Sequence, residues 1–115
     1  MIAVIFEVEP YAEHKQQYLE IAADLATMLR KIEGFISVER FQSLTNEGKI
    51  LSLSFFENEQ AVEQWRQLEE HRNAQSIGRD MLFENYRLRV VQVLRDYGKQ
   101  EREQAPDDSR KIHEK

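Results

Sequence analysis

The sequence predicts an α+β fold of the ferredoxin-like type, with elements in the order strand, helix, strand, strand, helix, strand. Three observations support this prediction. Two long stretches have helical periodicity, and each follows a strand-like run. A turn sequence separates the two middle strands, and the last long run is rich in β-branched and aromatic residues. The expected architecture is a four-stranded antiparallel sheet with both helices on one side.

Size and composition narrow the class of protein. A length of 115 residues suits one domain. Cysteine is absent, which excludes disulfides and thiolate metal sites and fits a cytoplasmic protein. The net charge of −5 argues against nucleic-acid binding. No apolar run approaches the ~20 residues of a membrane helix, and the N-terminus resembles a strand rather than a signal peptide.

Residues 2–8 predict a central strand, because they are mostly apolar and rich in β-branched side chains. Glu7 interrupts this run. A carboxylate inside a central strand needs water or a partner. Two interpretations therefore stay open: Glu7 points into a cavity, or it lies near the end of the strand and is solvated.

Residues 11–32 predict the first helix. Its apolar positions recur at the spacing of one helical face and are Tyr18, Ile21, Ala22, Leu25, Met28, Leu29 and Ile32. Gly34 follows as a C-terminal stop. A hairpin comes next, with strands at residues 35–44 and 49–56 joined by the turn residues 45–48.

Residues 58–79 predict the second helix, for which Asn58 is a suitable N-cap. We expect this helix to break near residues 69–70 and to resume at 71–79. Its apolar stripe contains Trp65, the only tryptophan. Trp65 is expected either to line a pocket against the sheet or to be ordinary core.

Residues 84–94 predict the last strand, and the ferredoxin-like domain is expected to span residues 1–98. Residues 99–115 carry five basic and five acidic side chains and almost nothing apolar. Such a segment buries too little surface to order itself, so a mobile tail, or a short helix followed by a tail, is expected.

Large apolar side chains occupy both faces of the predicted sheet, although two helices cover only one face. A sheet that is apolar on both sides exposes a large patch in a monomer, which usually marks an interface. Pairing by a two-fold axis is the commonest solution. The sequence therefore predicts a homodimer in which two sheets pack face to face as an α+β barrel.

Several motifs resemble the antibiotic biosynthesis monooxygenase (ABM) family, whose members form dimeric α+β barrels. The resemblance covers about residues 1–98 and is most specific around Trp65. Its motifs are Trp65-Arg66, Glu-His-Arg-Asn-Ala-Gln at residues 70–75, Gly78-Arg79, the run at 86–90 and the run at 95–98. The resemblance implies a homodimer that binds a small apolar or aromatic ligand. Some members are cofactor-free oxygenases of polycyclic aromatics, and others degrade haem.

Haem degradation is disfavoured by the residues themselves. The resemblance implies an Asn in the first strand, a Trp on the second helix and a haem-ligating His about three turns later. Trp65 matches, but the strand position holds Phe6 or Glu7, and the ligand position falls near Gln75, since His71 comes too early. We therefore expect no cofactor and no metal.

The favoured hypothesis is an oxygenase for an aromatic or quinol-like substrate. Trp65, Phe6 and Phe83 are expected to form the apolar walls of its pocket. The alternative is a non-catalytic dimer that binds a small ligand.

The polar site candidates come from the same motifs and from the first strand. His71 and Glu7 are the candidate bases, and Arg72 and Arg79 are candidates for stabilising a substrate anion. His71 has a structural alternative at the expected helix break. Glu7 would be a base only if it lies alone in an apolar pocket, whereas pairing with an arginine would make it a structural ion pair.

Overall fold

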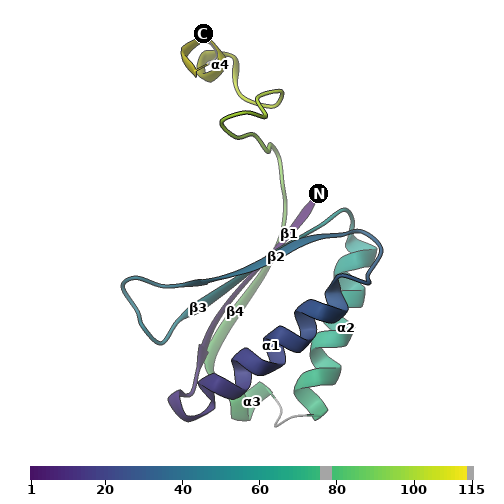
Figure 1. Ribbon diagram of the computed structural model, residues 1–115, viewed down its shortest axis with the longest axis vertical. Helices are drawn as coiled ribbons and strands as arrows, with labels where there is room; N and C mark the ends of the chain where they lie inside the picture. Colours follow the sequence, from purple (N-terminus) through teal and green to yellow (C-terminus); the bar gives the residue numbers. More distant parts are fainter. Residues whose placement is uncertain (76–78, 114–115) are drawn as a thin grey trace.

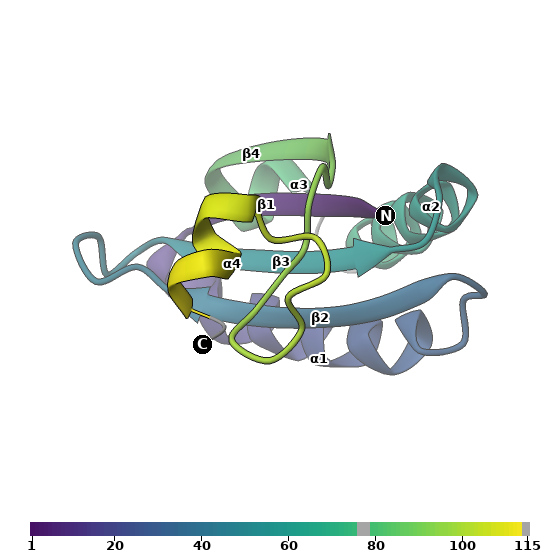
Figure 2. The same ribbon diagram turned by 90° about the horizontal axis from the view of Figure 1, so that it is seen from above.

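The sheet has four antiparallel strands in the order β2-β3-β1-β4, and α1 and α2 lie together on one of its faces (Figures 1 and 2). The computed structural model describes the backbone of residues 1–75 and 79–113, and the side chains of residues 1–69 and 81–110. The order of elements and the antiparallel pairing confirm the predicted ferredoxin-like fold.

Strand β1 (Ile2–Pro10) is central, between β3 (Ile50–Phe56) and β4 (Phe83–Gln92). Strand β2 (Phe35–Gln42) forms the edge next to β3 and completes the predicted hairpin. At its end the Gln42 side-chain amide donates to the carbonyl oxygens of Glu47 (2.9 Å) and Lys49 (3.1 Å), which ties the turn to the strand.

The first helical stretch is shorter than predicted. A 3-10 turn, η1 (Ala12–His14), precedes α1 (Lys15–Leu29). Gly34 then adopts a φ of 93°, the left-handed conformation that glycine tolerates best, and the chain turns into β2. A Cβ on Gly34 would lie 3.1 Å from the Cβ of Ala61, so the turn also packs tightly against the second helix.

Helix α2 (Glu59–Gln75) begins as predicted, since the Asn58 side-chain oxygen accepts a hydrogen bond from the Ala61 N–H at 3.0 Å. The predicted break at residues 69–70 is wrong. The helix continues through them to Gln75, and a short helix, α3 (Arg79–Leu82), then leads into β4. Glu69 therefore keeps the helical phase that begins at Asn58.

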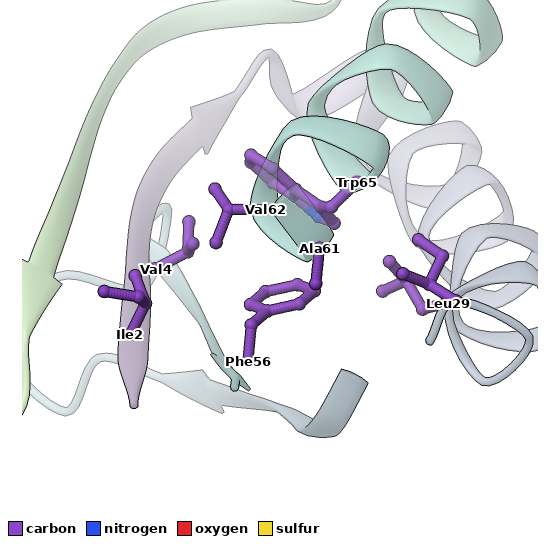
Figure 3. Close-up of a cluster of buried hydrophobic side chains, with 8 residues drawn as sticks. Ile2, Val4, Leu29, Phe56, Ala61, Val62 and Trp65 are labelled. Atoms are coloured by element: carbon purple, nitrogen blue, oxygen red, sulfur yellow. The ribbon is translucent and has the colours of Figure 1, made fainter. Parts of the chain in front are cut away.

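The hydrophobic core fills the layer between the sheet and the helices. Figure 3 shows Ala61, Val62 and Trp65 on α2 pointing toward Val4 and Phe56 on the sheet. A second cluster lies toward the other end of β1 and contains Phe6, Val8, Tyr18, Ala22, Ile50, Leu82 and Phe83. Along β1, the even-numbered side chains face the helices.

The opposite face of the sheet has no helix across it in the described chain. The register places a band of apolar side chains on this outer face, which we call the outer band: Ala3, Ile5, Phe41, Leu51, Leu53, Phe55 and Val91. Phe41 and Val91 are exposed, and Ile5, Leu51, Leu53 and Phe55 are half-buried. The predicted apolar character of both faces is thus present.

The C-terminal segment projects beyond the end of the sheet (Figure 1). It accounts for a radius of gyration of 16.6 Å, against about 13 Å for a compact chain of this length. Arg102 organises the segment: it donates to the Gly98 carbonyl oxygen (3.0 Å) and to Ser109 Oγ (2.7 Å), and it lies over the Tyr97 ring. A short helix, α4 (Asp107–His113), follows. The mobility expected for residues 99–115 stays a prediction.

Within the described residues, no helix combines the length and the apolar character that a membrane span needs.

Gly34→Ala is expected to destabilise the protein by about 1–3 kcal/mol, because alanine is strained at this positive φ and its Cβ meets Ala61. Urea unfolding monitored by circular dichroism would measure the change. Gly48→Ala is the matched control: its added Cβ would make only an ordinary contact, 3.6 Å from the Asn46 side-chain oxygen. Equal losses for the two variants would contradict the assignment of strain to Gly34.

Candidate functional site

A small chamber lies between the sheet and the two long helices, where the two core clusters meet. Its lining comes from β1, α1, β2, β3, α2 and β4. The lining residues are Phe6, Tyr18, Ile21, Ala22, Leu25, Leu29, Val38, Arg40, Ser52, Trp65, Glu69 and Phe83. Most are apolar, and Ser52 is a small side chain among larger neighbours, which leaves space at the middle of the sheet.

The free volume of the chamber is about 30 Å³. That volume accommodates about two water molecules, whereas a cavity that holds benzene measures about 150 Å³. The chamber is therefore closed around its own side chains in this structure. Binding of a ring compound therefore requires some of these side chains to move.

Besides Ser52, three larger polar side chains lie in the mostly apolar lining. Tyr18 comes from α1, Arg40 from β2 and Glu69 from α2. Tyr18 and Glu69 are buried, with 5% and 4% of their surfaces exposed, and Arg40 is half-buried. Polar groups removed from water in this way are costly unless they have partners, so their presence together is a site-like feature.

Arg40 is held by the backbone of the facing helix. Its Nη2 donates to the Ala22 carbonyl oxygen at 3.0 Å. Its Nε is buried and has no hydrogen-bond partner in the part of the chain that the structure describes. A guanidinium offers five N–H donors in a planar fork. Arg40 therefore retains a donor for which a ligand oxygen would be a suitable partner.

Burial raises the pKa of the Tyr18 phenol, since a phenolate would be poorly solvated in the chamber. The Glu69 carboxylate acts in the same direction, while the charge of Arg40 and its hydrogen bonding lower this pKa. The net result is a phenol that stays protonated at neutral pH. Tyr18 is thus a hydrogen-bond donor at this site and not a base.

The three predicted wall residues lie in the chamber. Phe6, Trp65 and Phe83 all line it, and Trp65 is also part of the core cluster, with 7% of its surface exposed. The two predictions for Trp65, pocket wall and core, therefore both describe it. Phe83 makes edge-on contacts with Phe6 (centroids 5.9 Å apart) and with Tyr18 (5.5 Å), which fixes the aromatic side of the chamber.

The structure places Glu7 on the outer face, away from the chamber. Its Oε1 lies 2.9 Å from Lys49 Nζ, and its Oε2 accepts a hydrogen bond from Arg89 Nη1 at 2.5 Å. Hydrogen bonds from Lys49 and Arg89 hold the pKa of Glu7 below its ordinary value. Glu7 thus meets the condition stated for a structural ion pair and lacks the condition stated for a base.

The other predicted polar residues are His71, Arg72 and Arg79. Their backbones belong to α2 and α3, but their side chains lie outside the described residues. Their proposed roles stay predictions. Among the described residues, no group of three or more His, Asp or Glu side chains is arranged to hold a metal ion.

The sequence analysis missed Tyr18, Arg40 and Glu69 as site residues. A signal was available for each. Tyr18 is part of the apolar stripe of the first helix, Arg40 alternates with inward-facing Val38, and Glu69 lies four residues after Trp65 on the same helical face. The expected helix break at residues 69–70 concealed the position of Glu69.

Comparison with known proteins provides evidence independent of this geometry. The protein-family model described as "Antibiotic biosynthesis monooxygenase" matches residues 1–76. A Pyricularia oryzae protein named jasmonate monooxygenase ABM is 46% identical over 93 residues, which is 81% of this chain and 43% of that protein. The chain thus spans less than half the length of this relative. The Bacillus subtilis protein YqjZ is 30% identical over 81% of this chain and 79% of its own length.

Solved structures support the same fold. A Mycobacterium tuberculosis protein has a TM-score of 0.73 at 17% identity, covering 84% of this chain and 98% of its own. A Pseudomonas aeruginosa protein has a TM-score of 0.66 at 16% identity, with coverages of 81% and 93%. At such low identity these likenesses concern the fold alone.

Glu7→Gln is expected to lower the urea midpoint at neutral pH, because it removes the charge that faces Lys49 and Arg89. Because the pKa of Glu7 is lowered in the folded state, the ion pair stabilises the protein fully above the ordinary pKa of 4.5. This stabilisation is lost as the pH falls through the lower folded-state pKa. Wild type and variant should therefore converge once the pH has fallen below the folded-state pKa of Glu7.

Glu9→Gln is the control, since Glu9 lies on the same face of β1 without an ion pair to any described residue. A midpoint difference between wild type and Glu7→Gln that stays constant from neutral to acidic pH would contradict the ion-pair assignment.

Proposed function

Because the chain belongs to the antibiotic biosynthesis monooxygenase family, we propose that it is a cofactor-independent monooxygenase for an aromatic or quinol-like substrate. The observation that carries the proposal is the apolar chamber beneath Trp65, with Tyr18, Arg40 and Glu69 in its lining. Such a chamber excludes water from a reacting anion and supplies donors that stabilise it.

The proposed chemistry uses electrons from the substrate itself. Loss of a proton converts an activated methylene compound into an electron-rich anion, which reduces O2. The methylene carbon loses four electrons and becomes a carbonyl carbon. One atom of O2 enters the product, and the other leaves in water with the two protons. The protein has to bind the ring, accept a proton and stabilise the anion.

The aromatic side chains have the role of walls in this proposal. Trp65, Phe6 and Phe83 contact the ring of the substrate after the chamber opens. His71, Arg72 and Arg79 stay candidates for the polar roles that the family resemblance implies. Glu7 is left out of the chemistry, because it is paired on the outer face.

The named relative supports the reaction class more than the substrate. The Pyricularia oryzae protein is called a monooxygenase, and the match to this chain covers 43% of its length. The match identifies no counterpart in this chain for the remaining part of that protein. We therefore propose the reaction class without proposing jasmonate as the substrate.

We also propose that two copies pair through the outer band. A face that carries Ile5, Leu51, Leu53 and Phe55 side by side is more apolar than solvent favours. Two-fold pairing of this face with itself would remove it from water and leave each chamber on the far side of its own sheet.

The proposed activity is tested by measuring O2 uptake and Trp65 fluorescence with hydroquinones and anthrones. Trp65 is the only tryptophan, so its emission reports on the chamber alone. We expect an anthrone to quench this emission and to be oxidised with uptake of O2, in the presence of a metal chelator and without added cofactor.

The same panel separates the alternatives. Quenching without O2 uptake would support the non-catalytic ligand-binding dimer instead. A Soret shift on titration with haem would support the haem-binding alternative. Absence of both quenching and O2 uptake across the panel would overturn the proposed function.

The proposed dimer is tested by Leu53→Glu, which places a carboxylate at the centre of the outer band, opposite Glu39. Wild type is expected to have about twice the 13.7 kDa chain mass in light scattering after size exclusion, and the variant should approach the mass of one chain. Leu44→Glu is the control, because Leu44 is 98% exposed in the hairpin turn. A monomeric wild type would refute the pairing.

A further inference from the structure

We propose that ligands enter the chamber between α1 and the edge strand β2, and that Arg40 both closes this entrance and binds the ligand. On binding, the guanidinium of Arg40 exchanges the Ala22 carbonyl for an acceptor oxygen of the ligand. This inference rests on the proposed function only in requiring that a small molecule occupies the chamber. It therefore applies equally to an oxygenase and to a non-catalytic binding protein.

The exposure of the lining residues locates the entrance. The described lining residues from β1, α2 and β4 are all buried. The half-buried ones come from α1, β2 and β3 and are Ile21, Val38, Arg40 and Ser52. Strand β2 is an outer strand of the sheet, and α1 runs beside it (Figure 2). Within the described lining, the chamber is therefore closest to solvent at the edge between α1 and β2.

Arg40 spans this edge. It lies on β2, across from Ser52 on β3, and its Nη2 donates to the Ala22 carbonyl oxygen of α1 at 3.0 Å. The side chain thus connects the strand and the helix that border the entrance. Arginine can keep its stem on apolar surface while its charged head reaches water. Arg40 can therefore turn outward and admit a ligand while its charge stays solvated.

The hydrogen bond that closes the entrance is replaceable. Ala22 lies inside α1, so its carbonyl oxygen also accepts the helical hydrogen bond from the Ala26 N–H, four residues later. A carbonyl oxygen has two lone pairs, and the helical bond persists when Arg40 leaves. Opening therefore leaves no acceptor of the helix unsatisfied. It requires the loss of one charge-assisted hydrogen bond, which a ligand can replace.

The donors of Arg40 favour a ligand that carries an oxygen. Its buried Nε has no hydrogen-bond partner in the described part of the chain. A ligand oxygen beside the guanidinium would satisfy this donor as well as the Nη2 donor released from Ala22. A hydrocarbon of the same shape would break the same closing bond and replace nothing. Preference for an acceptor oxygen follows from this difference.

The order of the strands determines how such a ligand lies. Phe6 and Phe83 come from β1 and β4, which lie on the side of the sheet away from β2. A ring in the chamber would contact this aromatic wall, while its oxygen faces Arg40 at the β2 edge. The ligand class is thus a ring compound with a ketone or a similar acceptor oxygen at one end. Recognition by Arg40 requires no acidic proton on the ligand.

Two neutral probes of matched size test the exchange. 4-Nitroacetophenone carries a ketone oxygen, and 1-ethyl-4-nitrobenzene has a methylene group in its place. Both carry a nitro group, which quenches tryptophan fluorescence, and neither has an acidic hydroxyl. Each probe is mixed with the full-length protein in a stopped-flow instrument. The emission of Trp65, the only tryptophan, then gives the association rate, the dissociation rate and the Kd.

Wild type is expected to bind the ketone about tenfold more tightly than the ethyl compound, since one hydrogen bond to a charged group has at least this effect. Arg40→Met removes the donors and keeps a long side chain, so this variant should bind the two probes equally. Its association rate for the ethyl compound should rise about tenfold, because the open state no longer competes with the bond to Ala22. Arg40→Lys should keep part of the ketone preference.

Arg66→Met is the matched control, because Arg66 is 62% exposed on α2. It should retain the ketone preference and the association rates of wild type. Equal affinities of wild type for the two probes would overturn the role assigned to Arg40, and so would a ketone preference that persists in Arg40→Met. If Arg40→Met does not fold, wild type and Arg40→Lys still decide the point.

The position of the entrance is tested with single cysteines, since the chain contains none. Ile21→Cys places a thiol at the proposed entrance, and Leu19→Cys places one at an exposed position of the same helix. A polyethylene glycol maleimide on Ile21→Cys should abolish the rapid association that the unlabelled variant retains. The same label on Leu19→Cys should leave association unchanged. Rapid association in labelled Ile21→Cys would overturn the proposed entrance.

Failure of this inference is distinguishable from failure of the proposed function. O2 uptake with the anthrone panel by a wild type that binds the two probes equally would overturn the inference and leave the monooxygenase in place. A ketone preference that Arg40→Met abolishes, without O2 uptake by wild type, would support the inference for a non-catalytic binding protein. A wild type that binds neither probe would overturn the inference, while O2 uptake decides separately on the oxygenase.

Discussion

The chamber depends on charged side chains that enter an apolar layer from both of its sides. Arg40 enters from the sheet and Glu69 from the helix above it. Removal of an ion from water costs several kcal/mol after relaxation, so neither side chain would be stable there in a purely hydrocarbon environment. The Ala22 carbonyl oxygen and the Tyr18 phenol supply part of the polar surroundings that the guanidinium needs.

The location of this site follows from how the core is divided. One cluster fills the layer around Val4 and Phe56, and the other fills it around Val8 and Phe83. The chamber takes its walls from both clusters and lies between them. Ser52 faces this point on β3, where it and the next inward-facing residue, Ser54, lie between the larger Ile50 and Phe56. A small side chain in that place leaves unfilled volume where a larger one would join the two clusters.

The fold was predictable because periodicity depends only on local sequence. The 3.6-residue and two-residue patterns identify the helices and strands, and the hairpin turn fixes the pairing of β2 with β3. The face of the sheet on which Glu7 lies was harder to predict. Strand β1 is apolar on both sides, so the alternation of its residues does not show which side faces the helices. The register decides it: Ile2, Val4, Phe6 and Val8 face the helices, so Glu7 faces outward.

The polar part of the site was hidden for a different reason. A helix break at residues 69–70, which the sequence analysis expected, would take Glu69 out of the helical phase of Trp65. The same residue is evidence for a site once the helix is known to continue, because Glu69 then faces inward with Trp65. The bulge between Phe35 and Ser37 similarly sets which side chains of β2 point inward, and Arg40 is among them.

Strand β1 separates the two surfaces on which the proposals depend. Its even-numbered side chains form the floor of the helix-covered layer, where Phe6 lines the chamber. On its other face, Ala3 and Ile5 lie in the outer band, and Glu7 forms ion pairs with Lys49 and Arg89. Because successive residues of a strand point to opposite faces, substitutions on one face reach the other only through the backbone. The same short strand can therefore hold a dry chamber on one side and an apolar pairing surface on the other, with little direct contact between them.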